Sequence, residues 1–295
     1  GGGRMRFLFP YSVLNVKTHK ELRRFMREHG NLRMITVYDR LFSGVTTDCV
    51  DIELHNCAAA ETMTVCSGGT IYETNKQWID KKHNCAFHLM SEQAHSVVEQ
   101  VYRQPYQTLD GSEWELGIVT GNNAAQLLRQ PYDRTEPIYT GKEIAPYRLS
   151  LPKYHILFEP QNCQQVAPLQ LYRAKEKLVY KFIANRPIFA FDDSGSLFLN
   201  SANILIPHIA GMSVKTVMAF LNSDLFAFLY QTLFGEIKIL QGNLLQLPFA
   251  VISSETDKMI TEMVDDILNG KADRHDEIQK VIYKCYEIEK IRLKR

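Results

Sequence analysis

The stretch RPIFAFDDSGSLFLNSANILI, residues 186–206, contains three short apolar runs separated by turn-forming residues. Apolar runs of this length, bounded by polar residues, are typical of β-strands. Asp193, Ser194 and Gly195 lie between the first two runs, so the pattern predicts a hairpin there. Further short runs with turn signals precede it from residue 113 onward, and together they predict a mixed, turn-rich domain with a β core.

Helices are predicted on the C-terminal side of this stretch. In SVKTVMAFLNSDLFAFLYQTLFG, residues 213–235, apolar side chains recur at helical spacing and are interrupted by the polar residues 222–224. This pattern predicts two short core helices joined by a cap. Residues 255–271 and 272–295 are predicted to form two amphipathic helices separated at Gly270.

The N-terminal part of the chain has a different pattern. Residues 7–14 are apolar at nearly every position, which predicts a strand buried on both faces. Thr18 is the expected N-cap of the helix that follows, and Gly30 its stop. Two more strands are predicted by residue 55, which amounts to half of a doubly wound sheet. After it we expect a short hairpin or an extension of the sheet over residues 57–79, and then a helix capped by Ser91.

Composition limits the class of protein. The 295 residues carry a formal net charge of only +1, so any basic surface has to be local. The six cysteines form no CxxC pair and the apolar stretches are interrupted by polar residues, which predicts reduced thiols, a cytoplasmic location and no membrane span.

Several catalytic motifs fail on context. The glycines at residues 1–3 precede a strand, whereas a phosphate-binding loop lies between a strand and a helix. A zinc site at HNCAFH, residues 83–88, lacks a second pair of ligands. A nuclease site at Glu236 and Lys238 lacks a partner carboxylate, and no GxSxG motif is present. The sequence therefore predicts no catalytic residue and no metal site.

Two Thr-Gly turns and one cluster of cations are the candidate binding features. GIVTGNN, residues 117–123, and PIYTGKEIAPYR, residues 137–148, suit loops that present amide groups and cations to phosphates. Arg173, Lys177 and Lys181 are spaced by four residues, so on a helix they would share one face. A solvated helix face and ordinary turns remain the alternatives.

Five blocks in sequence order resemble a known family. They are GIVTGNNAAQLL, PIYTGKEIAPYRL, the stretch of residues 174–207, the helical stretch up to LQLPF, and IQKVIYKCYEIEKI. Together they resemble the TaqI-like C-terminal specificity domain of type II restriction-modification N6-adenine DNA methyltransferases. Residues 1–55 resemble the segment downstream of the catalytic motif in the same enzymes, with LFSGVTTD, residues 41–48, on a loop near the active site.

The resemblance implies an α/β fragment, namely the late strands and helix of a Rossmann-like methyltransferase sheet, followed by an α+β target recognition domain with C-terminal helices. The implied parts are residues 1–60 from the methyltransferase domain, 61–112 as a connection, 113–250 as the recognition domain and 251–295 as a helical segment. The Gly-rich S-adenosylmethionine loop and the [D/N/S]-P-P-[Y/F/W] tetrapeptide are absent, so they are expected upstream of Gly1. This chain alone is expected not to methylate.

The resemblance also implies double-stranded DNA as the partner and S-adenosylmethionine as the cofactor of the parent enzyme, with no cofactor in this chain. The candidate DNA contacts are Thr120, Asn122, Asn123, Thr140, Lys142, Arg148, Arg173, Lys177, Lys181 and Lys238. The alternative hypothesis is a protein-interaction module, a split specificity subunit that docks on a separate methyltransferase chain through the exposed half-sheet of residues 1–55.

Overall fold

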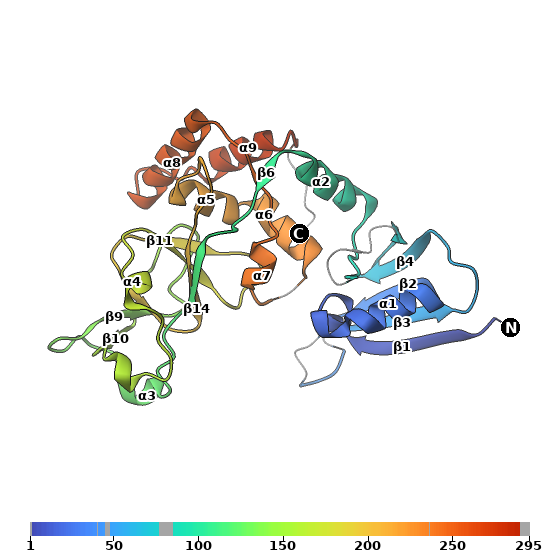
Figure 1. The fold of residues 1–295 in the computed structure, drawn as a ribbon, viewed down its shortest axis with the longest axis horizontal. Helices are drawn as coiled ribbons and strands as arrows, with labels where there is room; N and C mark the ends of the chain where they lie inside the picture. Colours follow the sequence, from blue (N-terminus) through green and yellow to red (C-terminus); the bar gives the residue numbers. More distant parts are fainter. Residues whose placement is uncertain (1, 40, 45–47, 77–84, 236, 290–295) are drawn as a thin grey trace. The chain divides into compact units, whose positions relative to one another are not determined.

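A computed structural model of the chain describes residues 2–39, 41–44, 48–76, 85–235 and 237–289 (Figure 1). The chain divides into two compact units. Unit 1 comprises residues 1–99 together with 232–234, and unit 2 comprises residues 100–231 and 235–295. No helix among the described residues has both the length and the apolar composition needed to cross a membrane.

Unit 1 is built on a five-stranded sheet with the strand order β1-β3-β2-β4-β5. Neighbouring strands are antiparallel except β2 and β4, which run parallel. One face of the sheet packs on a core that includes Met26 of α1 and Ile35 of β2. The elements are β1 (Arg4–Pro10), α1 (Lys20–His29), β2 (Asn31–Tyr38), β3 (Cys49–His55), β4 (Thr62–Ser67) and β5 (Thr70–Asn75).

The first strand differs from its prediction. β1 is an edge strand that ends at Pro10, and Met5 and Phe7 are exposed, so the expectation of a strand buried on both faces is wrong. The chain then forms two 3-10 helices, Tyr11–Leu14 and Lys17–His19, and the buried Arg23 guanidinium donates to the carbonyls of Val13 at 2.8 Å and Val16 at 2.8 Å. Helix α1 consequently begins at Lys20, and Thr18 is not its N-cap.

The predicted hairpin and helix that follow are confirmed. β4 and β5 pair in antiparallel register through Gly68 and Gly69, which both have positive φ, as a tight two-residue turn requires. Helix α2 (Glu92–Arg103) is capped by Ser91, whose Oγ accepts from the amide of Ala94 at 3.2 Å.

Unit 2 contains two four-stranded sheets that share one apolar core. The first has the order β12-β11-β14-β7, and the second has the order β13-β9-β10-β8. A short pair, β15 with β6, adds a third sheet. The strands are β6 (Tyr106–Gln107), β7 (Glu113–Leu116), β8 (Leu127–Leu128), β9 (Glu136–Tyr139), β10 (Tyr154–Ile156), β11 (Lys177–Lys181), β12 (Phe189–Asp192), β13 (Leu197–Phe198), β14 (Ala202–Ile206) and β15 (Phe249–Ala250).

The stretch of residues 186–206 is not a hairpin, contrary to the prediction. β12 pairs with β11 in the first sheet, whereas β13 pairs in parallel with β9 in the second. The turn between them is held by Asp192, whose carboxylate accepts from the amide of Ser196 at 3.0 Å and from its hydroxyl at 2.8 Å. The chain therefore crosses from one sheet to the other at this turn.

Lys177 lies at the same junction between the two sheets and contacts residues of both. Its ammonium group is completely buried, forms an ion pair with Asp192, donates to the carbonyl of Tyr172 at 2.6 Å, and lies 5.6 Å from the ring centroid of Phe198. Burial lowers the pKa of Lys177, and the Asp192 carboxylate opposes that change. Since residues 177–181 form β11, the predicted helix face of Arg173, Lys177 and Lys181 is wrong.

The C-terminal part of unit 2 is helical, as predicted. The helices are α5 (Val214–Leu221), α6 (Asp224–Leu233), α8 (Ser254–Leu268) and α9 (His275–Cys285), and unit 2 also contains the short α3 (Asn123–Gln126), α4 (Leu169–Tyr172) and α7 (Gln241–Leu244). Helix α5 packs on β11 and β12 of the first sheet, while α8 packs on α5. The predicted break between α5 and α6 is confirmed, and at this docking point the helices are hydrogen-bonded to the first sheet. The side chain of Asn222 exchanges two 2.9 Å hydrogen bonds with the backbone of Phe189 in β12.

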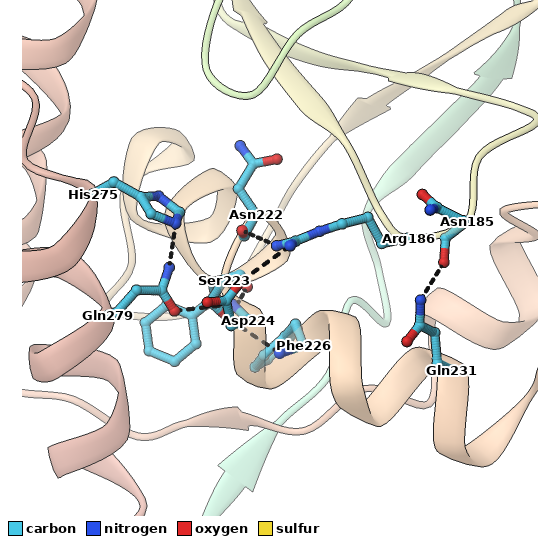
Figure 2. A network of polar contacts seen from close by, with 10 residues as sticks. Asn185, Arg186, Asn222, Ser223, Asp224, Phe226, Gln231, His275 and Gln279 are labelled. Carbon is cyan, nitrogen blue, oxygen red and sulfur yellow. Dashed lines mark hydrogen bonds and ion pairs between the residues drawn. The ribbon is translucent and has the colours of Figure 1, made fainter. Parts of the chain in front are cut away.

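A polar network extends from this docking point to α9 (Figure 2). Arg186 donates to Asp224 at 2.9 Å and to the carbonyl of Asn222 at 2.8 Å, and Gln279 accepts from the amide of Asp224 at 2.9 Å. The network fixes the start of α6 between the sheet and α9.

We predict that Lys177→Met lowers the free energy of unfolding by about 3–5 kcal/mol, because it leaves the Asp192 carboxylate buried without its cation. Urea denaturation followed by circular dichroism measures the change. Lys181→Met, at the other end of β11, is the matched control and should shift stability by less than about 0.5 kcal/mol. The double variant Lys177→Met/Asp192→Asn should recover most of the loss; equal stability of both single variants would contradict this account.

Candidate functional site

A cleft of about 830 Å³ in unit 2 lies at the ends of β9, β10 and β11. Four cationic side chains line it, contributed by Arg129, Lys142, Lys153 and Lys181. Its other lining residues are Asn123, Ala124, Leu127, Thr140, Gly141, Glu143, Tyr154, Phe182, Ile183, Leu199, Asn200 and Ser201. One carboxylate against four cations makes the cleft a strongly positive site on a chain whose net charge is only +1.

The turn after β9 is organised by the carboxylate of Glu143, which is buried. One of its oxygens, Oε2, accepts from the amide of Thr140 at 2.8 Å and from its hydroxyl at 2.6 Å. Its Oε1 lies 4.0 Å from the ammonium group of Lys153. These contacts close the turn on itself, so the exposed side chain of Lys142 projects from a fixed backbone.

Gly141 allows this turn to rest on the opposite wall of the cleft. Its amide donates to the hydroxyl of Ser201 at 3.0 Å. A Cβ at this position would lie 2.5 Å from the carbonyl oxygen of Ser201, so no side chain fits without moving backbone. The close approach of the two loops gives the cleft a defined width at this point.

The other Thr-Gly turn forms the start of α3. Asn122 caps α3, because its Oδ1 accepts from the amide of Ala125 at 3.2 Å. The hydroxyl of the buried Thr120 donates to Asn123 Oδ1 at 2.6 Å. Gly121 has a φ of +81°, a conformation that favours glycine. This turn therefore uses its polar groups to place Asn123 at the cleft.

The cleft brings together four of the ten predicted site residues, namely Asn123, Thr140, Lys142 and Lys181. Lys238 is exposed and lies beside the cleft, because its backbone pairs with Ile183. Arg148 is exposed on a separate turn at residues 145–148.

Besides Thr120 and Asn122, whose side chains hold the turn before α3, three of the predicted residues have internal roles. Lys177 is buried in the ion pair with Asp192, which removes it from the side chains that can contact a ligand. Arg173 makes two 2.7 Å hydrogen bonds to the carboxylate of Glu136 and a third to the carbonyl of Gly195. Thr140 was expected to present its donors outward, but both are directed to Glu143.

Sequence reasoning missed Arg129 and Lys153 as members of the cleft, together with Asn200 and Ser201. Arg129 follows β8 directly and Lys153 precedes β10 directly. The sequence shows that each of these cations adjoins a short strand. It does not show that the ends of these strands lie together, because that depends on the pairing order of the second sheet. Of the other candidate sites, His83 and Glu236 lie outside the described residues. The described residues contain no group of three potential metal ligands.

Comparison with known proteins gives the class of this domain. Residues 136–249 match the family model of the TaqI-like C-terminal specificity domain. This range contains β9 to β14, the first residue of β15 and most of the residues that line the cleft, so the part of the chain that carries most of the cleft is similar to TaqI-like specificity domains.

The relatives are restriction-modification proteins. The type II methyltransferase M.VspI from Vibrio sp. (strain 343) is 30% identical over 146 residues, which is 48% of this chain and 36% of that protein. The type IIL restriction-modification enzyme MmeI, solved in complex with DNA, has a similar fold with a TM-score of 0.61 at 10% identity, over 98% of this chain and 47% of that one. The type ISP enzyme LlaGI, solved with a DNA substrate mimic, gives 0.51 at 9% identity, over 89% and 35%. The chain spans less than half the length of these relatives.

We predict that Gly141→Ala lowers the free energy of unfolding by about 1–3 kcal/mol, because the added Cβ meets the Ser201 carbonyl oxygen and the turn has to shift. Gly242→Ala in α7 is the matched control, since its Cβ would meet no atom within 4 Å. It should be neutral or stabilise by up to about 1 kcal/mol. Thermal unfolding of both variants measures the difference, and equal effects would show that the close approach at Gly141 is not required.

Proposed function

We propose that this chain is the DNA-recognition part of a site-specific adenine-N6 DNA methyltransferase, and that the cleft of unit 2 holds duplex DNA. The observation that carries this proposal is the convergence of Arg129, Lys142, Lys153 and Lys181 on one cleft, most of which lies in the region similar to TaqI-like specificity domains. Cations in such a cleft bind phosphates and release counterions, which supplies affinity without sequence preference.

Sequence preference would come from the uncharged polar groups of the cleft. Asn123, Asn200 and Ser201 carry side chains that bond base edges, and an amide that makes two hydrogen bonds to a base typically discriminates by about 1–3 kcal/mol. Asn200 and Ser201 lie on the loop that joins β13 to β14. The proposal therefore assigns phosphate binding to the four cations and base contacts to these neutral side chains.

The cofactor belongs to the parent enzyme in this proposal. A strand-to-helix turn rich in glycine is needed for close approach of S-adenosylmethionine, but the connection from β1 to α1, residues 11–19, contains no glycine and its carbonyls bind Arg23. This connection therefore does not fit the cofactor. When bound in the parent, it would supply the methyl group, while this chain's residues bind and orient DNA.

We further propose that residues 1–60 belong to a Rossmann-like methyltransferase sheet, with 61–112 as a connection, 113–250 as the recognition domain and 251–295 as a helical segment. A cytoplasmic location follows from this role. The edge strand β1 supports the first assignment, because Met5 and Phe7 are exposed on a strand with only one neighbour. The same observation supports docking on a separate methyltransferase chain, which is the alternative function.

We predict that replacing Lys142, Lys153 and Lys181 together by Gln weakens binding of any duplex and lowers the slope of log affinity against log salt by about 0.9 for each lost phosphate contact. Fluorescence anisotropy with labelled duplexes at several salt concentrations measures both quantities. The matched control is Lys258→Gln on α8. The Lys258 side chain is exposed and does not line the cleft, so this variant should leave both the affinity and the salt slope unchanged. Wild-type protein that shows no salt-sensitive binding would contradict the proposal.

The adenine-N6 assignment has its own test. The complete parent enzyme, produced in cells without adenine methylation, should place N6-methyladenine at one short motif, as read by long-read sequencing of the host DNA. With Lys142, Lys153 and Lys181 changed to Gln, methylation at that motif should fall, because weaker phosphate binding lowers the occupancy of DNA. Methylation of cytosine instead would contradict the assignment to adenine.

A further inference from the structure

Two apolar side chains are exposed on loops that adjoin residues of the cleft in the sequence. Leu151 is 88% exposed and Tyr132 is 78% exposed, and these are the two highest values for large apolar side chains among the described residues. Single exposed apolar residues are common on proteins. Here both occur in loops of one small sheet, the sheet formed by β13, β9, β10 and β8.

The backbone that carries Tyr132 is held by a closed turn. The amide of Tyr132 donates to the hydroxyl of Thr135 at 2.8 Å, and that hydroxyl donates to the Tyr132 carbonyl at 2.6 Å. The amide of Thr135 also donates to the Tyr132 carbonyl, at 3.0 Å. Arg134 has a φ of +58°, which completes the reversal of the chain. An aromatic ring is thus presented to solvent on an ordered turn.

Both side chains lie within reach of the cleft. Tyr132 is three residues from Arg129, and Leu151 is two residues from Lys153, both of which line the cleft. A chain extends by at most about 3.6 Å per residue, so the Cα atoms are at most about 11 Å and 7 Å apart. The turn that carries Tyr132 also has Asp133 and Arg134, whose exposed charges offset each other. The cations of the cleft therefore set the charge of these surroundings.

We propose that Tyr132, with Leu151, contacts the base stack of DNA held in the cleft, where the tyrosine ring stacks on a base step that has opened. This inference rests on the proposed DNA-binding function. Phosphates neutralised by the four cations bring the duplex against both loops. An aromatic ring gains stacking energy from any base, and apolar side chains are the wedges with which proteins unstack base steps. Water is the competing environment, and it offers hydrogen bonds to the Tyr132 hydroxyl but no favourable contact to the tyrosine ring or to the Leu151 side chain.

The test compares two labelled duplexes that differ only in a single abasic site, which removes one base from the stack. Because opening the stack costs less there, the 295-residue chain should bind the abasic duplex more tightly, and the stacking of one ring corresponds to about fivefold or more. Tyr132→Ala should abolish this preference without changing the salt dependence. Tyr132→Phe should retain it, and Leu151→Ser should reduce it.

The possible failures are separable. Absence of salt-sensitive binding to either duplex would overturn the DNA-binding function and this inference with it. Normal salt-sensitive binding, with equal affinity for both duplexes in the wild type and in Tyr132→Ala, would overturn this inference alone. Equal weakening of both duplexes by Tyr132→Ala would show a surface contact without stacking, which also contradicts it. Circular dichroism melting of each variant controls for folding, and little change is expected because both side chains are exposed.

Discussion

The buried ion pair between Lys177 and Asp192 is the interaction on which the junction of the two sheets in unit 2 depends. Asp192 ends β12 in one sheet, holds the turn at Ser196, and so sends the chain into β13 of the other sheet. Lys177 neutralises that carboxylate and lies against Phe198 in β13. Without a cation at this point, a charged carboxylate would be buried between two sheets that share a core, at a large cost in desolvation. As long as Asp192 is charged, the pair therefore allows the two sheets to pack together without an uncompensated buried charge.

The cleft is a consequence of that packing. Its lining comes from the second sheet, through Arg129, Lys142 and Lys153, and from the end of β11 in the first sheet, through Lys181. Gly141 sets how closely the two walls approach, because it rests on the backbone of Ser201. Glu143 fixes the turn from which Lys142 projects. Each cation would gain little from a single phosphate in water, and their convergence in one cleft is what makes an anionic polymer a suitable ligand.

Local sequence patterns predicted the elements whose structure is local. The hairpin of β4 and β5 follows from adjacent glycines, and the break between α5 and α6 follows from the polar residues 222–224. The errors have tertiary causes. Because Lys177 and Lys181 are four residues apart, they match the spacing of one helix face. In the structure they are the two ends of the strand β11, and the ammonium group of Lys177 pairs with Asp192. The turn at residues 193–195 has hairpin chemistry, yet the pairing of β13 with β9 required a partner about 60 residues away, which no local pattern encodes. The same pairing order brings Arg129 and Lys153 to the cleft, so their place in it could not be predicted from local sequence patterns.

The central claim, that the cleft of unit 2 is the surface that meets DNA, is tested most directly by hydrogen–deuterium exchange of the chain with and without a saturating duplex. The account predicts that added DNA slows exchange in residues 123–129, 140–154, 181–183 and 199–201, which hold the residues that line the cleft. Protection confined to α8 and α9 or to unit 1, with these four segments unchanged under conditions in which the duplex is bound, would contradict it.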